Sequence, residues 1–243
     1  MKTKQKIFLA KIIFKLIRIF FPKKIKVKRN DIEWDLNLSE AIDLHIFIFG
    51  SFETEITNAA KNLQLQKYNQ IIDIGANFGI QSLQFAKNFN NSKIYAIEPT
   101  NYAFNKFIKN LELNPKLSKN INPFQMFLGS KDKEMPTSIY SSWNLESKEV
   151  KHSKHLGEKK STEKTNSLTL DEFVISNKIS NVDFIKLDVD GFEYEVLKGG
   201  TNFLKEKKPP IFMELAPYLY QEYGYNKEKI LELIISLNYN FYD

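Results

Sequence analysis

The chain has 243 residues, of which 42% are hydrophobic, and a formal net charge of +6 at pH 7. A chain of this length and apolar content can bury one good core, so we expect a single principal domain. It contains no cysteine, which excludes a disulfide framework and a thiolate metal site and is compatible with a reducing compartment. The three histidines, His45, His152 and His155, are too scattered to suggest a metal cluster, and we predict no metal site.

The positive charge is concentrated at the N-terminus. Residues 1–30 hold nine Lys and two Arg with no Asp or Glu, which leaves 24 basic against 29 acidic residues in the remainder. A nucleic-acid-binding protein carries its basic residues on the binding face itself. Because the basic residues here belong to a short arm, we predict no nucleic-acid partner.

Residues 5–21 of this arm predict a basic amphipathic helix. Lys11, Lys15 and Arg18 interrupt each apolar stretch before it reaches the length of a membrane span or of a signal-peptide core. Two interpretations remain open: residues 1–22 lie on an anionic bilayer, or the helix packs on the body of the protein or on a second subunit. We expect a cytoplasmic protein, peripheral on the inner face of the membrane under the first interpretation, and leave its oligomeric state open.

The segments that follow the arm alternate between strand and helix patterns. Residues 24–38 read as a β-hairpin with its turn at 29–31, and residues 54–65 predict a helix that leads to the core strand. Between them, residues 41–52 place His45 among aromatic and aliphatic neighbours. A lone histidine in such surroundings is more often structural, so we leave His45 out of the catalytic set.

The chain is organised around Ile71–Ile80. An apolar run long enough for one buried strand reaches Asp73 and passes at once into a turn that contains Gly75 and Gly79. Apolar residues then recur at helical spacing, so the unit reads strand, glycine turn, helix. Glycines remove side chains where the backbone must come close to a ligand. This unit predicts a nucleotide-type cofactor at a switch point of a parallel sheet.

The residues missing from the loop indicate which cofactor it binds. A dinucleotide site needs Gly-x-Gly-x-x-Gly, whereas this loop reads Asp73-x-Gly75-x-x-x-Gly79. An acid beside the loop would repel a diphosphate but suits a ligand that carries a sulfonium. The next strand, residues 93–97, ends in Glu98-Pro99, and an acid about 20 residues past the loop can accept both ribose hydroxyls. The pattern favours S-adenosylmethionine over NAD.

The remaining elements complete an alternating α/β order. A long polar stretch at residues 131–166 predicts a functional lid or a disordered loop, in which Trp143 either stacks on a sugar face or anchors the loop. The other predicted elements are a helix at 101–113 with Thr100 as its N-cap, a strand at 121–128, a helix opened by the capping box Thr169/Glu172, strands at 182–188 and 210–214, a helix at 226–237 and a strand at 239–242.

Acidic residues end four of the predicted parallel strands: Asp73, Glu98, Asp188 and Glu214. Because ligands bind at the carboxyl ends of such strands, these acids predict a rim that binds a cation and manages a proton. Lys186 lies in the strand that ends at Asp188, and a buried lysine must be paired because an isolated buried charge is costly. Further on, Asp190 and Glu193 are three residues apart, the spacing of a helix-capping pair, so they are either catalytic or capping residues.

Five separated motifs resemble the FkbM family of S-adenosylmethionine-dependent methyltransferases, over residues 52–214. They are DIGANFG, AIEPT, LELNP, SLTLDEF and IKLDVDGFEYEVLKGG, in the family's order. The resemblance implies an α/β, Rossmann-like class I methyltransferase fold, with a mostly parallel central sheet and helices on both faces. The C-terminal antiparallel strand usual in this fold is not evident. We divide the chain into an arm (1–30), a cap segment (31–66) that helps to cover the site, and a methyltransferase domain (67–243).

The resemblance also implies site residues. The expected cofactor-binding residues are Asp73, Gly75, Ala76, Asn77, Gly79, Glu98 and Pro99, with Leu128, Gly129 and Ser130 near the adenine by resemblance only. The expected catalytic residues are Asp188 as the leading general base, Asp190 and Glu193 as alternates, and Lys186 as the charge partner. The family pattern here is Lys-x-Asp-x-Glu-Gly-x-x-Glu or a close relative, and this chain has a shorter acid, Asp190, in the middle position.

The implied reaction is O-methylation of a carbohydrate hydroxyl, on a surface glycan or a lipid-linked sugar, or of a similar metabolite such as a polyketide-like product. A general base should assist the hydroxyl as it attacks. A divalent metal on Asp188 and Glu214 would acidify the hydroxyl equally well, although nothing in the sequence requires one. The alternatives are an NAD-dependent oxidoreductase and a non-catalytic, membrane-associated glycan-binding protein.

Overall fold

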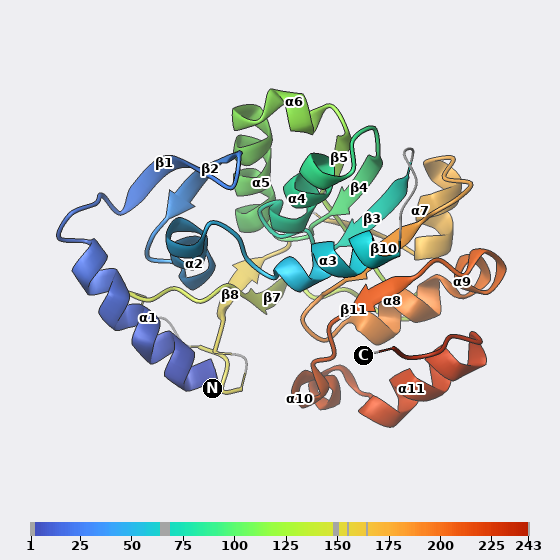
Figure 1. The fold of residues 1–243 in the computed structure, drawn as a ribbon. Coiled ribbons are helices and arrows are strands. Elements are labelled where there is room, and N and C mark those ends of the chain that lie inside the picture. The colour runs from blue at the N-terminus through green and yellow to red at the C-terminus, as the bar shows by residue number, and fades with distance from the viewer. Residues whose placement is uncertain (1–2, 64–68, 148–150, 155, 164, 243) are drawn as a thin grey trace.

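The centre of the protein is a five-stranded sheet in which every neighbouring pair of strands is parallel (Figure 1). The structure is a computed structural model and describes residues 3–63, 69–147, 151–154, 156–163 and 165–242. The strand order is β11-β10-β3-β4-β5. The bounds are β3 Gln70–Ile74, β4 Lys93–Ile97, β5 Ile121–Phe124, β10 Phe184–Leu187 and β11 Ile211–Met213. Among the described residues, this sheet contains no antiparallel strand.

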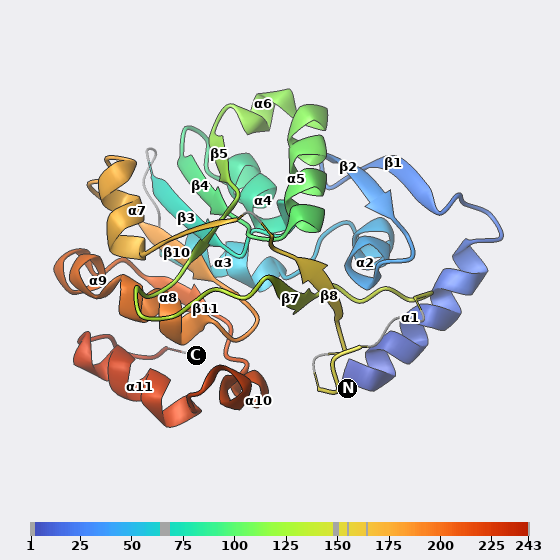
Figure 2. The same ribbon diagram turned by 180° about the vertical axis from the view of Figure 1, so that it is seen from behind.

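Helices cover both faces of the sheet, as Figures 1 and 2 show from opposite sides. One apolar core lies under α3 (Thr54–Asn62), α4 (Ile80–Asn88) and α5 (Asn101–Leu113). The other core lies under α7 (Leu170–Ser176), α8 (Glu193–Gly199), α9 (Thr201–Lys207) and α11 (Lys227–Ser236). The strands supply both cores in alternation: Ile71 packs into the first and Ile72 into the second. The predicted α/β architecture with helices on both faces is confirmed.

The N-terminal elements pack beside the first core. They are α1 (Thr3–Ile17), the antiparallel hairpin β1 (Lys24–Arg29) and β2 (Ile32–Asn37), and α2 (Ala41–Phe49). Asn30 and Asp31 in the hairpin turn both have positive φ, as a tight two-residue turn requires, and the predicted hairpin is confirmed. In the described part of the chain, no helix is both long and apolar enough to cross a bilayer.

Asn110 of α5 and Asn114, the residue that caps the C-terminus of α5, satisfy the free edge of β2. Asn114 accepts a hydrogen bond from the Glu33 amide at 2.9 Å and donates one to the Glu33 carbonyl at 2.7 Å. Asn110 accepts from the Asp35 amide at 2.9 Å and donates to the Phe78 carbonyl at 3.0 Å. The N-terminal hairpin is thereby tied both to α5 and to the loop that follows β3.

Replacing Asn114 by leucine is expected to lower the free energy of unfolding by about 1–3 kcal/mol, because two backbone groups of Glu33 lose their buried partner. Asn105 lies exposed on α5, the helix that Asn114 caps, so Asn105→Leu is the matched control and should stay within about 0.5 kcal/mol of the parent. Urea unfolding measures both. Equal stability of the two variants would show that these bonds do not hold the hairpin.

Four predicted segments differ from the structure. The strand predicted at 121–128 is divided, because the chain leaves the sheet at Gln125 and residues Met126–Leu128 form β6, which pairs with β9 (Asn166–Leu168). Pro123 has no N–H to donate, which suits the edge position of β5. Residues 131–166 are not structureless, because β7 (Ser138–Ser141) and β8 (Glu158–Ser161) form a hairpin there; residues 148–150, 155 and 164 lie outside the described residues.

The strand predicted at 239–242 is wrong, because these residues form neither strand nor helix. The Tyr239 hydroxyl instead donates a hydrogen bond to the Pro209 carbonyl at 3.1 Å. The predicted helix at 54–65 begins where expected but ends at Asn62, and residues 64–68 lie outside the described residues. The short helices α6 (Pro115–Ser118) and α10 (Pro217–Tyr220) and the 3-10 turn η1 (Gln221–Tyr223) complete the fold.

The helix-capping predictions for Thr100 and for Thr169 with Glu172 are confirmed. Thr100 caps α5 by accepting from the Ala103 amide, and Thr169 and Glu172 form the capping box of α7. Asp171, which the capping box leaves unexplained, accepts from the Phe203 amide at 2.8 Å and from Asn202. It therefore holds the start of α9 against α7.

Candidate functional site

The candidate site lies where the strand order reverses. From β3 the chain continues to β4 and β5 on one side and returns to β10 and β11 on the other, and ligands bind at the carboxyl ends of strands at such a point. A pocket opens there. Nine of the predicted site residues line it: Gly75, Ala76, Asn77, Glu98, Pro99, Leu128, Lys186, Asp188 and Asp190.

Gly75 is where the loop after β3 touches the end of β10. Its φ is +80°, and a Cβ added to it would lie 1.7 Å from the Asp188 carbonyl oxygen. Only glycine permits this approach and this backbone conformation. The two strand ends that form the floor of the pocket are therefore in direct backbone contact.

The amides of the glycine loop all donate within the chain. The Gly75 and Ala76 amides donate to the Ile97 carbonyl, both at 2.9 Å. The Asn77 amide donates to Glu98 at 3.0 Å, the Phe78 amide to the Asn77 side chain, and the Gly79 amide to the Ala76 carbonyl. A diphosphate site needs free loop amides that point at the ligand. All five amides of this loop are already hydrogen-bonded within the chain, so none of them is free to bind a diphosphate.

The lining of the pocket is acidic. Five carboxylates and one lysine face it among the described residues: Glu53, Glu98, Asp188, Asp190, Glu214 and Lys186. Charged and polar groups in a largely enclosed hollow interact more strongly than in water. The electrostatic character of the pocket therefore favours a cationic ligand over an anionic one.

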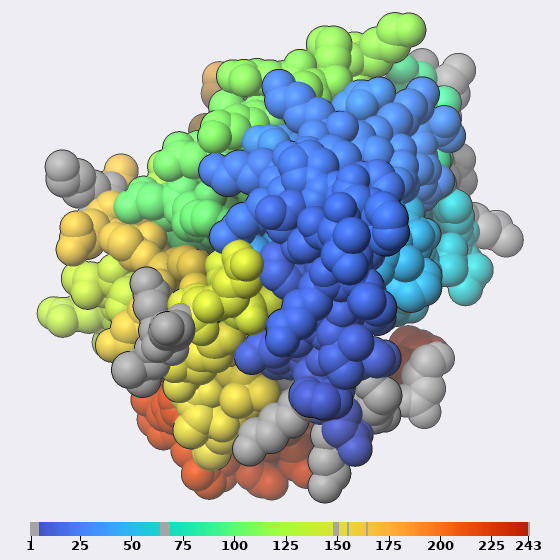
Figure 3. Space-filling view, turned by 90° about the vertical axis from the view of Figure 1, so that its left-hand side faces the viewer, coloured from blue at the N-terminus to red at the C-terminus, as the bar shows by residue number. Residues whose placement is uncertain are grey.

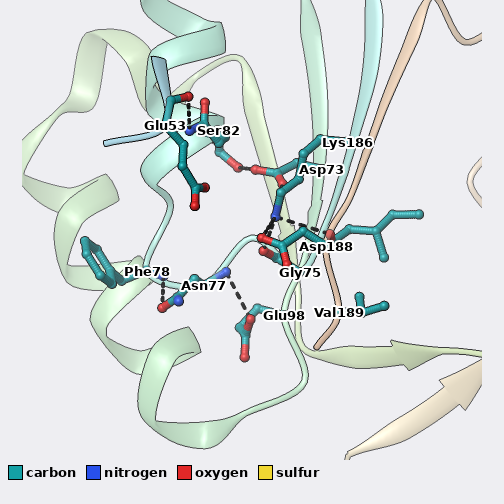
Figure 4. Close-up of polar contacts among 12 residues, drawn as sticks. Glu53, Asp73, Gly75, Asn77, Phe78, Ser82, Glu98, Lys186, Asp188 and Val189 are labelled. Atoms are coloured by element: carbon teal, nitrogen blue, oxygen red, sulfur yellow. Dashed lines mark hydrogen bonds and ion pairs between the residues drawn. The ribbon is translucent and has the colours of Figure 1, made fainter. Parts of the chain in front are cut away.

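Lys186 neutralises part of this charge from beneath the pocket (Figure 4). Its ammonium lies 3.2 Å from Asp188 Oδ2 and 3.7 Å from Asp73 Oδ1, and it donates to the Gly75 carbonyl at 2.7 Å. Burial alone would lower the pKa of Lys186, but the charges of Asp188, Asp73 and Glu53 outweigh burial and raise it. Lys186 is thus a permanent cation that fixes the ends of β3 and β10.

Glu98 is held by the chain at the end of β4. Its Oε1 accepts from the Thr100 amide at 2.8 Å and from the Thr100 hydroxyl, and its Oε2 accepts from the Asn77 amide at 3.0 Å. Burial raises the pKa of Glu98 to about 6 against these hydrogen bonds. Each carboxylate oxygen can accept more than one hydrogen bond, so a held Glu98 can still receive a ligand hydroxyl from the pocket side.

Glu53 and Glu214 lie at the wall of the pocket, and both have raised pKa values. Burial, with the charge of Asp188, raises the pKa of Glu53 to about 7. Burial and a hydrogen bond to Asp188 raise the pKa of Glu214, so that this carboxyl keeps its proton at neutral pH. Glu53 also has a φ of +50°, an uncommon backbone conformation for a residue other than glycine. Titratable groups shifted in this way cluster at functional sites.

The structure places five of the predicted site residues outside the pocket lining. Asp73 is fully buried under the loop, where Ser82 donates to it at 2.6 Å. Gly79 packs against the Phe107 ring, and Gly129 against Met135 and α8. The Ser130 hydroxyl donates to Glu195. Each of these four therefore contacts the chain rather than the hollow.

Glu193 is the fifth. Its carboxylate turns back and accepts from the Val189 and Gly191 amides, at 3.3 and 3.1 Å, so it stabilises the loop after β10. The predicted capping pair does not form: the N-cap of α8 is Phe192, which makes no side-chain cap. Asp190, with a φ of +49°, lines the pocket instead.

Sequence reasoning overlooked Glu53. The resemblance marks residues 31–66 as a segment that helps to cover the site, and Glu53 lies within it, but none of its residues was assigned to the site. Its neighbour Phe52 and the distant Trp143 also line the pocket. Only the fold brings these three residues together. The described residues contain no group of three His, Cys, Asp or Glu side chains placed to hold a metal ion.

Comparison with known proteins gives the family. The model of the methyltransferase FkbM domain matches residues 73–241, well over half of the chain. The methyltransferase sdnD of Sordaria araneosa is 28% identical over 178 residues, which cover 63% of this chain and 68% of sdnD.

Two solved structures resemble the fold at low sequence identity. TYW2 of M. jannaschii in complex with AdoMet has a TM-score of 0.46 and 14% identity, covering 92% of this chain and 77% of that chain. Precorrin-6y C5,15-methyltransferase of Geobacter metallireducens GS-15 has a TM-score of 0.45 and 12% identity, covering 76% and 70%. The family match and the architecture confirm the predicted Rossmann-like class I methyltransferase fold. The chain belongs to the FkbM methyltransferase family and is an S-adenosylmethionine-dependent methyltransferase.

Proposed function

We propose that the protein transfers a methyl group from S-adenosylmethionine to a hydroxyl of a carbohydrate or of a similar hydroxylated metabolite. The observation that carries this proposal is the carboxylate-lined pocket at the switch point, with five acids and one lysine. The bound cofactor supplies an activated methyl group on a positively charged sulfur. An acidic lining stabilises that charge, whereas the NAD alternative would require free loop amides, and the five loop amides are already engaged.

The residues present fit this cofactor. Glu98 lies at the end of β4, where a carboxylate can accept ribose hydroxyls. Phe127 and Leu128 offer an apolar wall beside it for a purine ring. The Ser142 hydroxyl is buried at the same pocket without a hydrogen-bond partner, so it is available to a ligand. Asp188 and Asp190 then face the positive end of the molecule.

Glu53 is our proposed general base. An effective base has a pKa near the working pH, and burial raises the pKa of Glu53 to about 7. As the acceptor oxygen takes the methyl group, its proton passes to the Glu53 carboxylate. Asp188 is a weaker candidate than the sequence suggests, because Lys186 and Glu214 both already contact its carboxylate. The proposed role of Asp188 is to pair with Lys186 and to keep negative charge at the pocket.

Calorimetry with the purified chain and measurement of S-adenosylhomocysteine release test the proposal. We expect binding of S-adenosylmethionine and none of NAD, and release of S-adenosylhomocysteine when hydroxylated sugars are added. Tight binding of NAD would overturn it in favour of the oxidoreductase. Cofactor binding without product release, over a panel of sugar and lipid-linked acceptors, would favour the non-catalytic alternative.

Replacing Glu98 by alanine is expected to weaken S-adenosylmethionine binding about 10- to 100-fold. The cofactor would lose a hydrogen bond to a charged group, and the loop would lose the hydrogen bonds by which Glu98 holds it. Calorimetry measures the affinity. Glu98→Gln is the matched control, because it keeps the shape of the side chain and should lose less. Wild-type affinity in Glu98→Ala would contradict the assignment of Glu98 to the cofactor.

A further inference from the structure

A second cavity of about 780 Å³ lies between α1 and α2. Most of its wall is aliphatic or aromatic, contributed by Ile7, Leu9 and Ile13 of α1, Leu44 and Ile48 of α2, and Tyr218. A cavity of this size and lining is typical of a small-molecule site. Its chemistry suits a hydrocarbon chain and not a free sugar.

The second cavity adjoins the cofactor pocket. Phe52, Glu53, Trp143 and Glu214 line both of them. A ligand that fills the second cavity therefore ends beside Glu53, the proposed base. The carboxylates stand at the junction, and the apolar wall leads away from them toward α1.

The helix that forms the outer wall is apolar on two sides. One side packs on the first core and lines the cavity through Ala10 and Ile13. The other side leaves Phe8, Ile12 and Leu16 more than two-fifths exposed, among several lysines. Figure 3 shows this helix at the surface, beside the yellow segment of residues 151–154 and 156–161. A basic helix with exposed apolar side chains is suited to the surface of an anionic bilayer.

We propose that the acceptor is an amphiphile with one long apolar chain, such as an acyl or isoprenyl chain, and a hydroxyl-bearing head group. The apolar chain of the acceptor lies in the cavity between α1 and α2, and its head group reaches Glu53. This inference rests on the proposed function, because it assigns the acceptor of the same site. It explains why an apolar cavity lies directly beside a carboxylate cluster.

Bromoalkanols test the site directly, because a bromine atom quenches a tryptophan that it touches. Trp143 lines both cavities, whereas Trp34, the other tryptophan, is fully buried in the first core. We expect the 2-bromo derivatives of hexan-1-ol, octan-1-ol and dodecan-1-ol, whose bromine lies next to the hydroxyl and therefore at the Trp143 end of the site, to quench part of the emission, with affinity rising roughly fourfold per added methylene until the cavity is filled. Trp143→Phe should remove the quenchable part.

Two matched variants test where the hydrocarbon chain of the ligand lies. Ala10→Phe fills the cavity and should weaken the binding of 2-bromododecan-1-ol at least about tenfold, while Ile12→Phe alters the exposed side of the same helix and should leave it unchanged. S-adenosylmethionine binding should be retained in both, which shows that they fold. Quenching without dependence on chain length, or equal binding by both variants, would overturn the inference. Failure of the wild-type chain to bind S-adenosylmethionine would instead count against the proposed function, whatever the bromoalkanols do.

Discussion

Glu53→Gln is expected to lower kcat by about 10²–10⁴-fold while leaving the affinity for S-adenosylmethionine within a few-fold of the parent. The reason is that glutamine keeps the shape of the side chain but cannot accept a proton. Because burial raises the pKa of Glu53 to about 7, the wild-type kcat/KM should increase as the pH rises through 7, where the carboxylate loses its proton. In Glu53→Gln this increase should disappear. Initial rates from pH 5.5 to 9, with calorimetry for the cofactor, measure both effects.

Asp188→Asn is the comparison that decides between the two candidate bases. If Glu53 is the base, Asp188→Asn keeps a pH-dependent increase in rate but moves it to lower pH, because the charge of Asp188 that helps to raise the pKa of Glu53 is gone, and it also affects cofactor binding because Asp188 helps to pair Lys186. If Asp188 is the base, the pattern reverses: Asp188→Asn loses the pH-dependent increase and Glu53→Gln retains it. Retention of the increase in Glu53→Gln would therefore end our assignment.

Lys186→Met is expected to lower the free energy of unfolding by about 3–5 kcal/mol, because it leaves Asp73 buried without its compensating charge. The Lys186 side chain is 4% exposed and that of Asp73 is fully buried, so salt screens the pair little. Urea unfolding at low and high salt measures the loss, which should be similar at both.

The double variant Lys186→Met with Asp73→Asn identifies the cause of that loss. Replacing both charges removes the unpaired group, so the double variant should be more stable than Lys186→Met alone. The two single substitutions would then show a clear coupling energy. Additive effects would mean that Lys186 stabilises the fold through its hydrogen bond to the Gly75 carbonyl and not through Asp73.

The strands, the glycine loop and the caps were predictable because their signals are local. The apolar run before Gly75, the strand at 93–97 and the capping box at Thr169 each depend on residues that are close in sequence, and the structure has them as expected. The predicted strand at 239–242 failed for a different reason. A short aromatic run has strand propensity, but propensity is decided by neighbours in the fold.

The site was predictable only where the strand order alone places a residue. Glu98, Asp188 and Glu214 follow three parallel strands, so alternation and order bring them to one rim. Asp73 also ends the apolar run, yet its side chain turns under the loop toward Ser82 and Lys186. The position of a residue in a strand does not determine this direction of its side chain. Glu53 reaches the pocket from a segment outside the sheet, and no local pattern marks it.

The exposed apolar side of α1 affects how the protein is handled after expression. Side chains such as Phe8, Ile12 and Leu16 in contact with water promote self-association, and detergent is the usual remedy during purification. An alkyl glycoside detergent, however, combines a hydrocarbon tail with a hydroxylated head. We therefore expect such detergents to inhibit competitively at concentrations well below micelle formation, and a preparation free of them to be the more active one.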